Sequence, residues 1–350
     1  MNIKSLYIIS LNDYDNKRVS LLAPIIHKGR TNMYHCIVNP SARSGKGKDI
    51  WKKLELKFHE KGIDYKAYMT KGPGDGTVLA QNITASNTDT KIVVLGGDGT
   101  LNEVMNGIAD FDKTIVGYIP IGSSNDFARD LSYPQNIDTL LDAILEGKVL
   151  RKLDLGKLTY NSMTAPMSRL HEKEISNTRI FDVSSGIGFD AAVCEEALAS
   201  GTKNFLNKIG LGKLTYGLIA IRQLLKADKI PCDIELDNGE VIHLKRFIFI
   251  AAMIHHYEGG GFNFAPKADL SDGKFDLVFA GDMPPLRMMF ALPFSFFGNY
   301  YWIKGIGHHV VKKVTIKPLL PLWVHTDGEV SVKSDNITLE CLQEKLQLMC

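Results

Sequence analysis

Residues 92–108 read IVVLGGDGTLNEVMNGI, and this stretch decides the fold. Its first four residues predict a buried strand, and Leu101 to Ile108 predicts a helix from its apolar spacing. Between them lies the turn Gly96-Gly97-Asp98-Gly99-Thr100. Glycines at this position let backbone N–H groups approach a ligand closely, and the start of the helix adds partial positive charge. The stretch therefore predicts a phosphate-binding turn between a strand and a helix.

Asp98 is the one acid in this turn. Beside bound phosphates an acid suits Mg²⁺, either directly or through water. Thr100 and Glu103 also match a capping box, in which two side chains satisfy free N–H groups at a helix start. A well-capped helix after a tight turn is the simpler alternative. We favour the phosphate site, because a cap needs neither the glycines nor the acid.

The rest of the first half alternates strand-like and helix-like segments, which predicts βαβ units and a parallel sheet. Two more loops of small residues follow predicted strands, NPSARSGKG at 39–47 and PIGSSNDFA at 120–128. Ligands bind at the carboxyl ends of strands in such sheets, so three loops meeting there predict a cradle for a nucleotide triphosphate. Lys46 is outside a Walker-A pattern, because G-x-x-x-x-G-K-[ST] is absent. The strand-like runs are Tyr34–Val38, Tyr65–Met69, Ile92–Leu95 and Ile115–Ile119, and the helices are expected around Ile50–Phe58, Asp75–Ala85 and Leu101–Ile108.

After about Leu150 the strand-like runs come close together, and one helix, Leu214–Leu225, interrupts them. Asn238-Gly239 between two runs is a strong hairpin signal. This pattern predicts an antiparallel sandwich or barrel. We therefore expect an N-terminal extension of unknown role at 1–32, a nucleotide-binding α/β domain at 33–150 and a mostly β domain, either sandwich or barrel, at 151–350. The runs are Ile180–Val183, Ile234–Leu236, Phe247–Ile254, Phe275–Phe279, Val310–Ile316, Val330–Val332 and Leu346–Met349.

Composition excludes several classes of protein. The 350 residues carry 41 Lys and Arg against 39 Asp and Glu, a formal charge of +2 that argues against a nucleic-acid partner. The five cysteines form no C-x-x-C pair, so neither a disulfide framework nor a zinc cluster is predicted, and a reducing cytoplasm fits. No apolar stretch reaches the length of about 18 residues that a membrane-spanning helix needs.

The motifs in the first half, N-P-x(n)-S-G-x-G, G-G-D-G-T-L-N-E-V-x-N-G and P-x-G-[ST]-x-N-D-F-A, occur in an order that resembles the bacterial branch of the diacylglycerol kinase catalytic superfamily. The resemblance runs from Met33 to Met349. It implies a Rossmann-like α/β domain of the NAD-kinase and diacylglycerol-kinase type, a C-terminal antiparallel β-sandwich domain and an active site in the cleft between them. The second-half motifs are GIGFDA at 186–191, GGG at 259–261, PKA at 266–268, SDGK at 271–274 and HTDGE at 325–329.

The resemblance also implies an ATP-dependent lipid kinase that uses Mg²⁺. Ser123 stands where relatives usually have Thr, and the hydroxyl is kept. The first loop is slightly longer, at Ala42-Arg43, than in many relatives. By motif position, the nucleotide contacts would be Asn39, Pro40, Ser41, Ala42, Arg43, Thr70, Gly97, Asp98, Gly99, Thr100, Leu101, Asn102, Glu103 and Ser123.

The same resemblance puts the general base in the D-G-E motif, and we favour Asp327, with Glu329 as its neighbour or alternate. From the residues alone, Asp-Gly between two strands is a hairpin turn. Relatives hold a structural Mg²⁺ at a second Asp-Gly turn, which here implies the Asp272 carboxylate with backbone carbonyls of Asp269 and Lys274. Asp190 is a further candidate for the cleft.

Two other features have competing interpretations. His255-His256 and His308-His309 suggest a metal, but adjacent side chains on a strand point to opposite faces, so we do not expect one. Met283 to Trp302 is rich in Met and aromatic residues and is broken by Pro293 and Gly298. It is either a packed helix and turn or a wall that contacts lipid. In the second case four nearby cations suit an interface near anionic lipid, namely Arg287, Lys304, Lys312 and Lys313.

The leading hypothesis is a kinase that phosphorylates diacylglycerol to phosphatidic acid. NAD kinases also carry G-G-D-G-T, but their G-S-T-A-Y-type motif is absent. A nucleotide- or lipid-binding module without catalysis is the third possibility. The partners would be ATP and a lipid presented at a membrane surface, with a homodimer left open, in a cytoplasmic protein peripherally associated with the membrane. No short motif distinguishes diacylglycerol from monoacylglycerol, phosphatidylglycerol, a sphingoid base or a polyprenol.

Overall fold

The structure is a computed structural model that describes residues 33–349 except 87, 132, 135, 148–149, 165–175, 200–221 and 225–229. The expected extension at 1–32 lies outside the described residues, as does almost all of the expected helix at Leu214–Leu225. The bounds below refer to the described part of the chain.

A parallel sheet forms the first half of the structure, as the alternating pattern predicts. Its order is β2-β1-β3-β4, and every neighbouring pair is parallel. The carboxyl ends of these strands lead into the three loops of small residues. The strands are β1 (Tyr34–Val38), β2 (Tyr65–Met69), β3 (Thr90–Gly96) and β4 (Thr114–Pro120).

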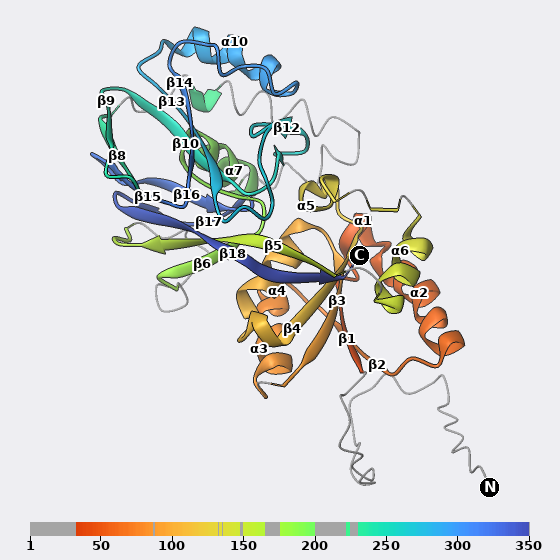
Figure 1. The fold of residues 1–350 in the computed structure, drawn as a ribbon. Coiled ribbons are helices and arrows are strands. Elements are labelled where there is room, and N and C mark those ends of the chain that lie inside the picture. Colours follow the sequence, from red (N-terminus) through yellow and green to blue (C-terminus); the bar gives the residue numbers. More distant parts are fainter. Residues whose placement is uncertain are drawn as a thin grey trace, which may run out of the picture. The chain divides into compact units, whose positions relative to one another are not determined.

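Helices cover both faces of this sheet (Figure 1). Successive residues of a strand point to opposite faces. Cys36 therefore packs against α2 and α6, while Ile37 packs against α3 and α4. The long helices are α2 (Gly47–Lys61), α3 (Asp75–Thr84), α4 (Asp98–Gly107) and α6 (Ile137–Glu146), and the short ones are α1 (Ala42–Gly45), η1 (Phe111–Lys113) and α5 (Asp126–Arg129).

The same sheet continues into the second half through the last strand. The end of β18 pairs in parallel with β4, whereas its length pairs antiparallel with β5 and β15. β15 pairs with β8, and β8 pairs with β9 across Asn238-Gly239, which confirms the predicted hairpin. These strands are β5 (Leu150–Tyr160), β6 (Thr178–Phe181), β8 (Cys232–Leu236), β9 (Val241–Leu244), β15 (Lys313–Pro318) and β18 (Ile337–Met349).

A second, antiparallel sheet completes the sandwich, in the order β14-β13-β10-β7-β16-β17. Leu158 and Ile316 of the first sheet share one buried cluster with Ile250 and Leu277 of the second. The expected β-sandwich is therefore confirmed. Its elements are β7 (Ser184–Gly188), β10 (Phe247–Met253), β13 (Phe275–Gly281), β14 (Ile306–Val311), β16 (Leu322–Thr326) and β17 (Glu329–Ser334), with the hairpin β11 (Tyr257–Glu258) and β12 (Phe262–Asn263) and the helices α7 (Phe189–Ala199) and α10 (Pro285–Ser295).

Three expectations about single elements are wrong. The run Val310–Ile316 is two strands of different sheets, because the chain turns at Lys312. The last strand begins at Ile337 and ends beside β4, so it is longer than the predicted Leu346–Met349. The predicted strand Ile180–Val183 ends at Phe181, and β7 begins three residues later.

Candidate active site

The glycine turn lies between β3 and α4, and Gly97 is the N-cap residue of the helix. Thr100 and Glu103 do not cap this helix, so the expected capping box is wrong. Oγ1 of Thr100 accepts a hydrogen bond from Nδ2 of Asn39 at 2.9 Å, which ties the turn to the first loop. The Glu103 carboxylate accepts from the N–H groups of Gly74 at 2.7 Å and Gly76 at 2.9 Å. Both side chains thus hold neighbouring loops against the turn.

The third loop packs directly on the same turn. A Cβ added to Gly97 would lie 3.1 Å from the Cα of Gly122. Thr70 joins the group through its N–H, which donates to the carbonyl of Val38 at 2.9 Å. The structure thereby brings Asn39, Thr70, Gly97, Thr100 and Ser123 to one edge of the sheet, as expected.

One predicted nucleotide residue, Leu101, has a side chain that points away from the loops, and the residues of the first loop lie at the surface. The Leu101 side chain is fully buried in the core beside α3, so only its backbone is available. Arg43 is exposed in α1 and has a left-handed φ of 51°. Pro40, Ser41 and Ala42 lie in the same short segment, and the N–H of Ser41 donates to Oδ1 of Asn39 at 3.0 Å.

Asp98 is paired with a second acid that the sequence interpretation left without a role. The N–H groups of Asp126 and Phe127 donate to the Asp98 carboxylate, and its Oδ1 has no hydrogen-bond partner. Burial, together with the charge of Asp126, raises the pKa of Asp98 to about 6. Oδ2 of Asp126 accepts from the N–H of Gly260 at 2.9 Å, and burial also raises the pKa of this acid.

This pair fits a divalent cation. Mg²⁺ is commonly held by one or two carboxylates together with phosphate oxygens. Oδ1 of Asp98 and Oδ1 of Asp126 are buried and accept no hydrogen bond. Nη2 of Arg129 lies 3.6 Å from Oδ1 of Asp126, so a cation there would share this oxygen with the guanidinium. Within the described part of the chain, no cluster of three or more metal-ligating side chains occurs, so phosphate and water would complete the ligand set.

Asp327 lies in the turn between β16 and β17, where its φ is 50°. Its Oδ1 accepts from the N–H groups of Val183 and Ser184, both at 2.9 Å. Its Oδ2 accepts from the N–H of Asp182 at 3.0 Å and from Nδ2 of Asn102 at 2.5 Å. Both oxygens of the Asp327 carboxylate already accept two hydrogen bonds each, which leaves no free lone pair for a substrate hydroxyl. This geometry makes Asp327 an anchor of the turn.

Glu329 is the free acid of the motif. A Cβ added to Gly99 would lie only 3.7 Å from Oε1 of Glu329, so this carboxylate stands over the glycine turn. The Glu329 charge also contributes to raising the pKa of Glu103, which burial raises most. The residues that the structure describes donate no hydrogen bond to Glu329, and its lone pairs are open to a substrate hydroxyl.

A buried acid–histidine group lies behind this turn. Nε2 of His325 is 3.0 Å from Oδ2 of Asp190 and 3.4 Å from Oε1 of Glu258. Burial alone would lower the pKa of His325, but the two facing carboxylates raise it to about 9, and burial raises that of Glu258 to about 7. Gly186 makes room for the pair, because a Cβ there would come within 2.7 Å of Nε2. Asp190 is therefore the hydrogen-bond partner of His325.

The histidine pair at 255–256 does not lie on a strand, because β10 ends at Met253. The expectation of opposite faces is therefore wrong for this pair. Nδ1 of His255 and Nδ1 of His256 lie 3.2 and 3.1 Å from the same oxygen, Oδ2 of Asp130. Despite burial, these hydrogen bonds hold the pKa of Asp130 below its ordinary value. They connect the segment after α5 to the end of β10.

The other pair, His308 and His309, lies on β14. Nε2 of His308 is 2.5 Å from Oδ1 of Asp276, and the His309 ring stacks on Phe279 with a centroid distance of 5.9 Å. The two side chains have separate partners.

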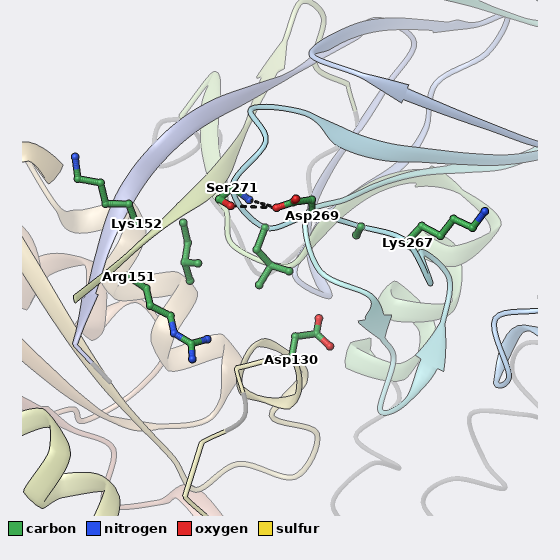
Figure 2. Close-up of a pocket in the computed structure, with 9 residues that line it drawn as sticks. Asp130, Arg151, Lys152, Lys267, Asp269 and Ser271 are labelled. Carbon is green, nitrogen blue, oxygen red and sulfur yellow. Dashed lines mark hydrogen bonds between the residues drawn. The ribbon is translucent and has the colours of Figure 1, made fainter. Parts of the chain in front are cut away.

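A cavity of about 530 Å³ opens beside Asp130 (Figure 2). The Arg151 guanidinium points toward Asp130, whereas the Lys152 and Lys267 side chains point away. Asp269 lines the same cavity, and its Oδ1 accepts from both the N–H and Oγ of Ser271 at 3.0 Å.

The predicted structural-metal residues share the turn that follows this cavity. Oδ1 of Asp272 accepts from the N–H of Lys274 at 2.9 Å. The buried Asp154 on β5 braces the turn, since it accepts from the N–H of Gly273 at 2.7 Å and from that of Glu344 at 2.6 Å. Sequence reasoning missed Asp154, whose only signal was an acid inside an apolar strand.

Comparisons with known proteins find relatives for both halves of the chain. The family model for the diacylglycerol kinase catalytic domain matches residues 33–158, and the model for the YegS C-terminal NAD kinase beta sandwich-like domain matches residues 183–350. The "Putative lipid kinase YtlR" of Bacillus subtilis (strain 168) is 28% identical over 298 residues, 84% of this chain and 92% of that protein. A diacylglycerol kinase of Staphylococcus saprophyticus is 27% identical over 302 residues, 85% of this chain and 88% of that protein.

A solved structure has a similar fold. The crystal structure titled "a putative diacylglycerol kinase from Bacillus anthracis str. Sterne" superposes with a TM-score of 0.68 at 26% identity. The match covers 92% of this chain and 98% of that one.

Proposed function

The chain belongs to the diacylglycerol kinase family of lipid kinases, and on that premise we propose that it phosphorylates diacylglycerol to phosphatidic acid with ATP. One observation carries the proposal. The D-G-E turn of the sandwich places the free carboxylate of Glu329 over Gly99 of the glycine turn. A base beside a phosphate-binding turn is the arrangement that transfer of a phosphoryl group to a hydroxyl requires.

In this mechanism Glu329 acts as the general base. Its carboxylate takes the proton of the lipid hydroxyl while that oxygen forms a bond to the γ-phosphorus. The bond between the γ-phosphorus and the bridging oxygen breaks, and ADP leaves with that electron pair. Backbone N–H groups of Gly97, Asp98 and Gly99 would face the phosphates, whereas that of Thr100 donates to the carbonyl of Gly97 at 3.0 Å. Asp327 would hold the base in place through its hydrogen bonds to the backbone. Positioning and electrostatics, rather than covalent chemistry, supply most of the rate.

Asp98 and Asp126 would hold the catalytic Mg²⁺. The ion would neutralise developing charge on the phosphate oxygens when bound. A second, structural Mg²⁺ would lie at the turn after the cavity, with the Asp272 carboxylate and the backbone carbonyls of Asp269 and Lys274 as ligands. Two hydrogen bonds that fix the turn support this second site. The N–H of Lys274 donates to Asp272, and the N–H of Gly273 donates to Asp154.

The lipid is proposed to reach the site from a membrane surface, with the protein bound peripherally. The acceptor is tested with γ-labelled ATP and a panel of lipids in mixed micelles, with NAD as a further acceptor. Label in phosphatidic acid supports the proposal. Label in another lipid reassigns the substrate, and label in NADP or in no product contradicts the proposed reaction.

Two matched variants report on the site in the same assay. Asp98→Asn removes a proposed metal ligand and should weaken use of Mg·ATP. Asp64→Asn, at an exposed position on the loop before β2, should leave the rate unchanged. Equal rates for both variants would mean that the motif mapping is wrong.

A further inference from the structure

The helix α10 has an apolar side that faces solvent. Its inner side is buried through Met288, Ala291 and Ser295. On the opposite side Leu286 is 75% exposed and Phe290 is 54% exposed. Among the described residues, no helix combines the length and apolar character needed to cross a bilayer.

The turn after α10 continues this exposed surface. Phe296 is 49% exposed, Phe297 82% and Trp302 63%. We call Leu286, Phe290, Phe296, Phe297 and Trp302 the aromatic face. Exposed apolar residues gathered in one short segment mark an interaction surface.

The aromatic face has internal support and a basic border. The Phe294 ring joins helix and turn, with centroid distances of 5.0 Å to Phe290 and 5.8 Å to Trp302. Nη1 of Arg287 donates to the carbonyl of Lys304 at 3.2 Å, so both cations lie at one border of the face. From Met283 to Lys304 the sequence contains no Asp or Glu. The segment that forms the face therefore combines apolar residues with two cationic residues and no acid.

A short series of contacts leads from the aromatic face to the proposed metal pair. The ring of Phe296 stacks on Phe262 with a centroid distance of 3.9 Å. Phe262 begins β12, directly after the glycine loop 259–261. In that loop the N–H of Gly260 donates to Asp126 at 2.9 Å. These contacts place one edge of the aromatic face next to the hairpin that reaches the proposed metal pair.

We propose that the aromatic face is the surface on which the protein docks to a bilayer containing anionic lipid. Aromatic side chains enter the boundary between headgroups and acyl chains, while Arg287 and Lys304 meet the anionic headgroups. The bilayer is favoured over a second protein because the segment Met283–Lys304 carries two cationic residues and no acid. The proposal rests on the proposed function and deepens it by naming the surface through which the protein meets the bilayer.

Vesicle sedimentation without nucleotide tests the docking directly. The double variant Phe290→Ser/Phe297→Ser is compared with wild type on vesicles of phosphatidylcholine and phosphatidylglycerol. Loss of two exposed aromatic anchors should weaken binding at least about tenfold. The matched control is Leu319→Ser/Leu320→Ser, because these leucines are 67% and 51% exposed in the loop after β15. The control should bind like wild type.

Further readouts separate docking from folding and catalysis. Phosphorylation of a short-chain diacylglycerol in detergent should be unchanged in the double variant, whereas phosphorylation in vesicles should fall with binding. Trp302 fluorescence, taken as the difference from Trp302→Phe, should be quenched by brominated lipid. Sedimentation needs no ATP and no phosphorylation. It therefore tests membrane docking even if diacylglycerol is the wrong acceptor. Vesicle binding by the double variant that equals wild type would overturn the proposal. The proposal would also be overturned if the double variant lost self-association while it still bound vesicles, because the face would then be a contact between two copies of the chain.

Discussion

Nδ2 of Asn102, in the helix after the glycine turn, donates a hydrogen bond to Oδ2 of Asp327, which lies 225 residues further along the chain. The bond joins the motif that faces the phosphates to the motif that carries the proposed base. Arg179 adds a second tie, since its Nη2 donates to Oδ1 of Asn102 at 3.1 Å. The position of Glu329 over Gly99 is thus set by buried polar contacts between the parallel sheet and the sandwich.

Asp327→Asn should destabilise the fold. The asparagine amide would turn an N–H group toward backbone donors that now meet a carboxylate oxygen. Leaving buried donors unsatisfied costs about 1–3 kcal/mol. Urea unfolding measures the loss, with Asp64→Asn as the control at an exposed position. An unchanged midpoint would show that the backbone anchors contribute nothing.

Asp98→Asn should stabilise the metal-free protein while impairing activity. The pKa of Asp98 is raised from 3.8 to about 6 in the folded state, so the folded state binds the proton more tightly than the unfolded state. Stability from this group is then greatest at low pH and is lost as pH rises through about 6. At pH 8 the neutral variant avoids that cost, and calorimetry should show a higher Tm. A lower Tm would contradict the burial of an unpaired charge.

The pH profile of the wild-type protein tests the same group independently. Activity that needs ionised Asp98 should fall as pH decreases through about 6. Because a divalent cation competes with the proton, more Mg²⁺ should move this acidic limb to lower pH. An acidic limb that does not respond to Mg²⁺ concentration would argue against Asp98 as a ligand.

Asp130→Asn should weaken the connection between α5 and the end of β10. The pKa of Asp130 lies below its ordinary 3.8, so its contribution is present above that pH and is lost in more acidic solution. The pKa of His256 is raised above 6.5, so its contribution is present below 6.5 and is lost as pH rises through the raised value. The free energy of unfolding of the variant should therefore fall most between pH 4 and 6.5, by about 1–3 kcal/mol relative to wild type. Denaturant melts at pH 5 and pH 9 measure this difference, and equal losses would contradict the histidine pairing.

Much of the architecture follows from local pattern. The strand at Ile92–Leu95 and the helix from Leu101 predict a parallel sheet with a glycine turn between strand and helix, and the structure has both. The ligand of this turn stays a prediction. The Asn238-Gly239 hairpin is equally local. By contrast, the return of β18 to β4 pairs Gln347 with Ile115. The hydrophobic pattern of the last strand cannot predict that it pairs with β4, because the two strands are far apart in the sequence.

The site residues show the same division. The three loops could be placed at one edge because parallel strands end there together. The hydrogen bonds of Asp327 could not be predicted, since they depend on the backbone of residues 182–184. Asp126 had a visible signal, an acid after a strand in the NDFA segment, but its partner Asp98 is nearby only in the folded chain.

The most direct test of the central claim is single-turnover phosphoryl transfer from ATP to diacylglycerol by the Glu329→Gln variant. As the general base, Glu329 should account for roughly 10²–10⁴-fold of the rate, with ATP affinity nearly unchanged. Glu329→Asp, which keeps the carboxylate, should recover part of that rate. A wild-type rate for Glu329→Gln would contradict the claim that this carboxylate, held over Gly99, takes the proton of the lipid hydroxyl.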